Sequence, residues 1–275
     1  MIITPGSIKT AQLHAYLLGS VAPRPICFAS TIDAEGNANL SPFSFFNVFG
    51  SNPVTLIFSP ARRVRDNTIK HTLENCIETK EVVISVVNYN MVQQMSLASC
   101  EYPKGVDEFA KAGFTPLAAQ HVKPFLVKES PVNMECIVKQ VIETGQEGGA
   151  GNLIICEMVA MHINDAVLNE AGQIDPHKID LVARMGGDYY CRASGDAVFT
   201  VPKPNMKLGV GIDALPEAIR NSTVLTGNDL GMLANVSELP AGAEHASLSQ
   251  DIHLKARDLL AQQMVDEAWM ALLEK

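Results

Sequence analysis

The stretch "NLSPFSFFNVFGSNP", residues 39–53, is unusually rich in aromatic residues for its length. A half-buried strand alternates apolar and polar residues, and an amphipathic helix repeats its apolar residues every three or four positions. This stretch matches neither period cleanly. Within seven positions it carries four phenylalanines: Phe43, Phe45, Phe46 and Phe49.

Two interpretations of this segment remain open from its residues alone. It is either a core segment near the end of a barrel strand or the wall of a pocket for a planar heteroaromatic ligand. In a pocket, the phenylalanines would face the ring and the hydroxyls of Ser41 and Ser44 would bond its edges. We expect Pro42 to break the strand, which would leave nearby backbone amides free for a ligand.

The flanking sequence predicts a mainly β fold. Residues 25–42 read as a hairpin that turns at Asp33 and Gly36, because glycine supplies the positive φ that such a turn needs. Further strands are expected at 54–60, 81–88, 132–143 and 153–163, the last two joined by the glycine-rich loop "TGQEGGAGN" (144–152). Helices are expected at 66–79, capped by Asp66 or Asn67, and at 91–97 and 107–112. Hairpin-connected strands interrupted by helices indicate a small antiparallel barrel with helical insertions.

Composition changes near residue 195, so we expect a barrel domain over 1–195 and a C-terminal extension over 196–275. "VPKPN" (201–205) is typical of a stiff linker. An amphipathic helix is predicted over 247–273, with Ser247 and Gln250 as a capping box. Its apolar stripe must cover the barrel or a partner subunit. The stripe consists of Leu259, Leu260, Met264, Ala268, Trp269, Leu272 and Leu273.

Bulk composition excludes several classes of protein. The 275 residues carry a formal charge of -9, which argues against nucleic acid or an anionic membrane as partner. The start lacks a signal-peptide pattern, and the apolar run at 153–163 is too short to span a membrane. Six cysteines without a C-x-x-C pair fit reduced thiols in a cytoplasmic protein. The seven histidines form no H-E-x-x-H motif, so no metal site is expected.

Basic residues cluster in "ARRVRDNTIK" (61–70), which contains Arg62, Arg63, Arg65 and Lys70. Beside a predicted helix N-terminus this cluster could hold an anion. It could equally be a solvated loop whose arginines pair with surface carboxylates. Together with the hydroxyls and rings of 39–53, it suggests a phosphorylated planar cofactor.

The run "VAPRPICFASTIDAEGNANLSPFSFFN" (21–47) resembles the signature of the flavin reductase-like family. The segments 70–86, 101–116, 129–136 and 183–190 ("ARMGGDYY") are also similar to that family, so the resemblance covers roughly residues 10–195. It implies an antiparallel FMN-binding split β-barrel with helical insertions, here followed by a C-terminal helical extension. It further implies a homodimer with FMN near the subunit interface.

The resemblance also implies which residues hold FMN. Ser30 and Thr31 would lie at the flavin or its ribityl chain. The isoalloxazine ring would be lined by Ser41, Ser44, Phe45, Phe46 and Asn47. The phosphate would be held by Arg63, Lys70 and Thr72, with Arg184 as an additional cofactor-binding candidate. No catalytic side chain is implied, because flavin N5 accepts a hydride directly and the protein supplies placement and electrostatics.

Two departures from the family pattern bear on activity. Lys70-His71-Thr72 stands where the family has K-D-T, and 149–152 lacks the histidine of the G-D-H motif of many NAD(P)H-dependent members. We expect an enzyme, an NAD(P)H:flavin oxidoreductase that reduces FMN with NADH or NADPH and supplies a monooxygenase or another acceptor. The alternative is a flavoredoxin-like electron-transfer protein without NAD(P)H activity. A barrel that has lost its cofactor and serves as an interaction module is the third hypothesis.

Overall fold

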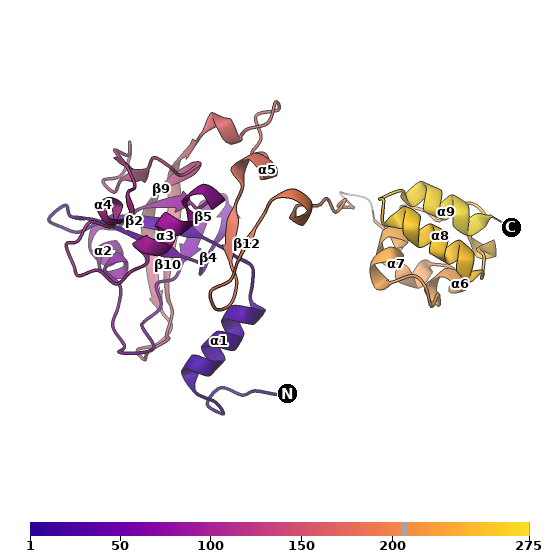
Figure 1. Cartoon of the computed structure of the whole chain (residues 1–275), viewed down its shortest axis with the longest axis horizontal. Helices are drawn as coiled ribbons and strands as arrows, with labels where there is room; N and C mark the ends of the chain where they lie inside the picture. Colours follow the sequence, from indigo (N-terminus) through magenta and orange to yellow (C-terminus); the bar gives the residue numbers. More distant parts are fainter. Residues whose placement is uncertain (205–207, 275) are drawn as a thin grey trace. The chain divides into compact units, whose positions relative to one another are not determined.

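The computed structural model describes residues 1–204 and 208–274. The chain forms two compact units, Met1–Phe199 and Thr200–Lys275, each with its own hydrophobic core. The first unit is mainly β with helical parts, and the second is helical (Figure 1). None of the described helices is long and apolar enough to cross a membrane.

The first unit is organised around a seven-stranded sheet in which every neighbouring pair is antiparallel. Its hairpins confirm the prediction of an antiparallel sheet with helical insertions. From one edge to the other, the strands are β3 (Ala38–Phe43), β2 (Cys27–Ile32), β6 (Glu81–Val86), β9 (Val132–Glu143), β10 (Asn152–Ile163), β5 (Val54–Phe58) and β4 (Phe46–Ser51).

The two edge strands of this sheet, β3 and β4, are consecutive in sequence. Only Ser44 and Phe45 separate them, so the last residue of β3 and the first of β4 are at most about 11 Å apart. A sheet whose opposite edges are tied so closely must curl round on itself, and it stays unpaired where the edges meet. The stretch 39–53 therefore makes the sheet a split barrel.

Pro42 does not break the strand as expected but lies inside β3, opposite Phe28 of β2. An edge strand tolerates proline because one row of its amides has no strand partner. The stretch has no regular period because it contains two edge strands joined by a two-residue link. The side chains of an edge strand are exposed in a different pattern from those of an inner strand.

Both faces of β2 are buried, which explains its continuous apolar run. Cys27 and Ala29 join one cluster with the helix α2 (His71–Thr79), and Phe28 joins a second cluster with α3 (Val92–Ala98) and α4 (Glu108–Ala112). These helices match the predicted insertions.

The start of α2 differs from the prediction, because Lys70 occupies the N-cap position instead of Asp66 or Asn67. The carboxylate of Asp66 is used locally: it accepts hydrogen bonds from the amide (3.1 Å) and hydroxyl (2.6 Å) of Thr68. Asn67 has a φ of 59°, outside the extended region that an N-cap residue adopts. The basic segment is therefore an irregular loop up to residue 70.

Short elements complete the first unit. They are α1 (Thr10–Ser20), a 3₁₀ helix (Tyr89–Met91), a second one (Asp165–Val167), α5 (Pro176–Ile179), a third 3₁₀ helix (Gly195–Ala197), the two-stranded sheet β7 (Pro116–Leu117) and β8 (Leu126–Val127), and the three-stranded sheet of β1 (Arg24–Pro25), β11 (Val182–Arg184) and β12 (Tyr190–Arg192).

Glu135 is a fully buried carboxylate on β9 that fixes the loop before β8. It accepts hydrogen bonds from the backbone amides of Gln120, His121 and Val122, and it lies 2.6 Å from Nε2 of His162. Burial alone would raise the pKa of this carboxyl, but these hydrogen bonds outweigh it and the pKa is lowered. The loop is thus attached to the sheet by an ionised group.

The second unit contains α6 (Glu217–Arg220), α7 (Gly227–Ala234), α8 (Gln250–Leu260), α9 (Val265–Leu273) and 3₁₀ helices at Ile212–Ala214 and Ala243–His245. The helices gather into one cluster, drawn orange to yellow in Figure 1. The continuous helix predicted over 247–273 is wrong: the chain turns between α8 and α9, where Gln263 has a φ of 64°.

The predicted capping box is also wrong, because Ser249 is the N-cap of α8 and its side chain makes no capping bond. The capping box of this unit lies at Thr226 and Asp229, at the start of α7. The apolar stripe packs inside the unit: Leu260, Trp269 and Leu272 are buried in a core shared with α7.

Candidate functional site

The barrel unit is hollowed where its two edges meet. An "aromatic groove" of about 300 Å³ is lined by the β3–β4 link, the end of α1, α3 and the β11–β12 hairpin; its residues are His14, Leu18, Arg24, Ile26, Pro42, Phe43, Ser44, Phe45, Met95, Ser99, Arg184 and Tyr190. A "basic cavity" of about 30 Å³ adjoins it; its residues are Asn39, Ser41, Arg63, Lys70, His71, Thr72, Ser99, Cys100, Glu101, Tyr102 and Glu108. Ser99 lines both.

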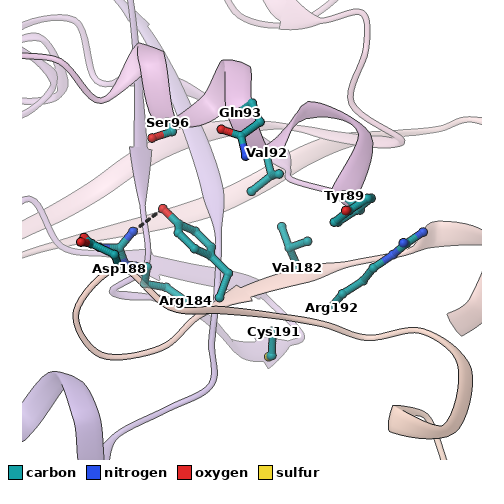
Figure 2. Close-up of a pocket in the computed structure, with 10 residues that line it drawn as sticks. Tyr89, Val92, Gln93, Ser96, Val182, Arg184, Asp188, Cys191 and Arg192 are labelled. Carbon is teal, nitrogen blue, oxygen red and sulfur yellow. Dashed lines mark hydrogen bonds between the residues drawn. The ribbon is translucent and has the colours of Figure 1, made fainter.

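A third hollow, the "distal cavity" of about 430 Å³, lies between α3 and the β11–β12 hairpin. Figure 2 shows its labelled residues, with Val92, Gln93 and Ser96 of α3 opposite Val182 of β11. Arg184 and Tyr190 line this cavity as well as the aromatic groove, so the two hollows share a wall.

Arg24 assembles the aromatic groove. Its guanidinium is almost completely buried and donates to the carbonyls of Leu18 and Val21 at the end of α1, and to that of Met185 after β11. Its Nε donates to the Ser44 hydroxyl at 3.4 Å. The pKa of Arg24 is lowered, first by burial and then by the positive charge of Arg184. One residue thereby joins the end of α1, the chain after β11 and the β3–β4 link.

Phe45 supplies the aromatic wall of the groove. The residue is 41% exposed, an unusual state for phenylalanine in a packed domain. The guanidinium of Arg24 lies 5.9 Å from the ring centroid, and the His14 ring meets it edge-on at 6.3 Å. A rigid apolar face beside fixed hydrogen-bond donors is the pattern of a small-molecule site.

Lys70 is the cation of the basic cavity. It is partly buried, it pairs with no carboxylate in the described part of the chain, and its Nζ lies 3.4 Å from the Ser41 hydroxyl and 5.0 Å from the Phe43 ring. Burial lowers the pKa of this ammonium, and the nearby Arg63 lowers it further. A desolvated cation without a counter-ion favours the binding of an anion.

Arg63 shares the basic cavity but already has a partner. Its Nε lies 3.0 Å from Glu101, and a second oxygen of Glu101 lies 2.8 Å from Arg65. Its Nη1 donates to the Thr68 hydroxyl and the Ile69 carbonyl. Glu101 is exposed, so this carboxylate covers the arginines without being locked in place.

The backbone of the glycine-rich loop 144–152 is hydrogen-bonded to the backbone of the basic segment 61–70. The amide of Gly149 donates to the carbonyl of Arg62, and the amide of Arg62 donates to that of Ala150. A side chain at Gly148 would come within 2.9 Å of the Arg63 carbonyl oxygen. The loop therefore needs glycine for a close approach to the backbone that carries Arg63.

Thr72 lines the basic cavity from a buried network. Its hydroxyl donates to Oδ1 of Asn39 at 2.8 Å, and the Asn39 amide donates to both oxygens of Glu108 at 3.1 Å. Glu108 also accepts from the amide of Leu40, and burial raises its pKa. The network fastens edge strand β3 to α4, which fixes the position of Ser41.

The structure brings together seven of the eleven predicted site residues. Ser44, Phe45 and Arg184 line the aromatic groove, and Ser41, Arg63, Lys70 and Thr72 line the basic cavity. The other four predicted residues line neither hollow.

Ser30 and Thr31 are completely buried in β2, where the Ser30 hydroxyl has no hydrogen-bond partner among the described residues and Thr31 bonds to Asn39 and Asn75. Phe46 packs on the barrel core. Asn47 is exposed on β4, where its oxygen accepts from the amide of Val48.

Several lining residues were not predicted, chiefly Arg24, Ser99 and Tyr190. Arg24 and Tyr190 stand in the P-R-P and R-x-G-G-x-Y-Y motifs, so their motifs were visible although their roles were not. Ser99 carries no signal of its own, because it follows an amphipathic helix like any solvent-exposed serine. No three His, Cys, Asp or Glu side chains gather as a metal site within residues 1–204 and 208–274.

The chain is similar in sequence and in structure to known proteins. Residues 18–178 match the flavin reductase like domain. An uncharacterized protein of Aquifex aeolicus is 35% identical over 189 residues, which are 69% of this chain and 94% of that protein. Nitrilotriacetate monooxygenase component B from Bacillus cereus gives a TM-score of 0.67 at 26% identity and covers 73% of this chain and 98% of its own.

A Shewanella frigidimarina protein with a split barrel domain gives a TM-score of 0.62 at 26% identity, covering 74% of this chain and 99% of its own. These proteins are matched almost end to end, yet about a quarter of this chain lies outside the match. The matched sequence, the split barrel and the groove at its split agree: the chain belongs to the flavin reductase-like family.

Proposed function

We propose that this protein binds FMN, with the isoalloxazine ring in the aromatic groove and the phosphate at the basic cavity. The observation that carries the proposal is Lys70, a partly buried ammonium that pairs with no carboxylate of the described chain and lies beside the Ser41 hydroxyl. In a chain of charge -9, such a cation favours an anionic ligand. The neighbouring aromatic groove, with the ring of Phe45 in its wall, favours a ligand that is also planar.

The donors of the basic cavity fit a phosphate group. Lys70 offers a point charge, Ser41 a hydroxyl, and Arg63 the planar guanidinium that suits phosphate oxygens. Glu101 occupies Arg63 through its ion pair, so it would have to turn outward when the phosphate enters. Glu101 is exposed, which permits that movement, and its carboxylate would keep the ion pair with Arg65.

Bound FMN would supply a group that accepts a hydride at N5. The chain's own contribution is orientation and charge. Arg24 and Arg184 bring two positive charges to the groove, and neither pairs with a carboxylate in the described ranges. Positive charge fixed beside the ring would stabilise its anionic reduced form.

The reaction that this site supports best is NAD(P)H-dependent reduction of FMN by direct hydride transfer. A flavoredoxin-like electron carrier is the second candidate, and the loop 149–152 favours it. That loop has no histidine, and its backbone is occupied by bonds to Arg62. It therefore offers no side chain of the kind that many NAD(P)H-dependent members place near the nicotinamide.

We further propose a homodimer with the groove near the subunit interface, and a monooxygenase or another protein as electron acceptor. Val48 and Phe49 on edge strand β4 support the dimer, since they are 57% and 65% exposed beside the groove-forming link. Phe46 and Asn47 are on the same strand, so in such a dimer they would lie near FMN bound at the subunit interface.

Titration of the purified chain with FMN, followed by flavin fluorescence, tests the cofactor. We expect saturable quenching with one FMN per chain and much weaker binding of riboflavin, which has the ring but no phosphate. Equal affinities for the two flavins would remove the basic cavity from the site. No binding of either flavin would leave the interaction-module hypothesis.

A further inference from the structure

The distal cavity is built by cross-strand pairs of the β11–β12 hairpin. Arg184 stands opposite Tyr190, and Val182 stands opposite Arg192. Residues directly opposite each other in an antiparallel pair share one face, so all four side chains face the same side. Figure 2 shows Val182 between Arg184 and Arg192, with α3 facing them. The volume of about 430 Å³ lies within the range of small-molecule sites.

The two arginines of this cavity are in different states. Arg192 is bound to both oxygens of Asp180 at 2.7 Å and stacks 3.8 Å from the Tyr89 ring centroid. Its charge is neutralised, so it forms a wall with Tyr89.

Arg184 stacks on the Tyr190 ring and donates to the Tyr190 hydroxyl and the Gly187 carbonyl. It has no carboxylate within ion-pair distance in the described chain. A guanidinium has five N–H donors, so three remain for a ligand.

Charge and shape together define the ligand. Tyr89 and Tyr190 line the cavity with aromatic rings, Val182 is an apolar lining residue, and Gln93 and Ser96 supply neutral polar groups. Asp188 lines the cavity too, but it is exposed and forms no ion pair with Arg184. An unpaired planar guanidinium that stacks on one aromatic ring, in a cavity lined by a second, suits a carboxylate on a flat ring.

We propose that the distal cavity is a second ligand site, for a small aromatic carboxylate, and that Arg184 binds the carboxylate group. Because Arg184 and Tyr190 also line the aromatic groove, the ligand would lie one side-chain layer from that groove. The proposal concerns binding alone and does not depend on the identity of any cofactor in the groove.

The test is ¹⁹F NMR of 4-fluorobenzoate mixed with the full chain, with 4-fluorobenzamide as the uncharged probe of the same shape. Fluorine detection is insensitive to flavin colour, so the experiment can be run with and without added FMN. We expect line broadening for the benzoate and little for the benzamide. Arg184→Gln should weaken benzoate binding about tenfold or more.

A second variant protects the test against misfolding. Ser96 is exposed on α3, so Ser96→Phe should fill the cavity without disturbing the core and should also abolish the broadening. Arg220→Gln, in the helical unit, removes a positive charge elsewhere and should change nothing. The proposal is overturned if the benzoate does not bind at millimolar concentration, if the benzamide binds equally well, or if both cavity variants retain full binding. If benzoate binds and both cavity variants lose it, but FMN does not bind, only the cofactor proposal is contradicted.

Discussion

Replacement of Lys70 by methionine should separate the phosphate from the ring in flavin binding. Methionine is an unbranched apolar side chain that removes the ammonium beside Ser41 and the Phe43 ring. A hydrogen bond to a charged group contributes about 1.5–3 kcal/mol, so FMN should bind roughly 10- to 150-fold more weakly. Riboflavin, which lacks the phosphate, should bind the variant and the wild type alike.

Fluorescence titrations of both flavins against both proteins measure this difference. Lys139→Met is the matched control, since Lys139 is an exposed lysine on β9 that pairs with Glu157 of the neighbouring strand β10. An equal loss for FMN and riboflavin would mean that the variant distorts the ring site, and an unchanged FMN affinity would refute the role of Lys70.

The same titrations carry a pH signature. Burial, and then Arg63, lower the pKa of Lys70 below its usual value. FMN affinity should therefore fall on the alkaline side at a pH below that typical of lysine, because the ammonium loses its proton there. The Lys70→Met protein should lack this step.

Three further substitutions probe the supports of the site. Glu101→Gln frees Arg63 from its surface ion pair. Such a pair contributes at most about 1 kcal/mol, so FMN should bind up to about fivefold more tightly. The control Glu74→Gln, which removes a charge on α2, should not tighten FMN binding. Gly148→Ala forces the new Cβ against the Arg63 carbonyl at 2.9 Å and should weaken FMN binding severalfold, whereas Gly145→Ala in the same loop should have little effect. Glu135→Gln should lower the free energy of unfolding of the barrel by about 1–3 kcal/mol at neutral pH, followed by circular dichroism because the single tryptophan lies in the other unit. The folded-state pKa of Glu135 is lowered, so its stabilisation is present above the ordinary pKa of glutamate and is lost as the pH falls through the folded value; the variant should show a flatter acid limb, and an unchanged limb would contradict this reasoning.

Much of the barrel follows from local sequence rules. The hairpin at 25–42 and the long pair of strands around 144–152 are marked directly by their apolar, β-branched runs and their glycine turns. Edge strand β4 was not predicted, and Pro42 was expected to end β3, because residues at a sheet edge and beside a groove follow no strand period. Closure of the barrel depends on β3 and β4 lying at opposite edges of the sheet, which no local pattern of the sequence indicates.

The candidate site was predictable where side chains act near their own segment. Ser44, Phe45 and Lys70 stand in motifs whose composition already suggested rings, hydroxyls and an anion. Arg24 could not be assigned in this way, because its role is to join segments through backbone carbonyls, one of which is 161 residues away.

The break between α8 and α9 was equally hidden from the sequence. Gln263 takes a left-handed conformation without a glycine or proline to mark it. Only the packing of the two helices on one core reveals the turn.

Anaerobic rapid mixing of the FMN-loaded protein with NADH, and separately with NADPH, tests the central claim most directly. The absorption of oxidised flavin is followed during the reaction. We predict that at least one nucleotide bleaches the flavin within the time of an enzymatic turnover, which would also identify the donor. A protein that holds FMN and is bleached by dithionite, yet ignores both nucleotides, would contradict the reductase and establish the electron carrier in its place.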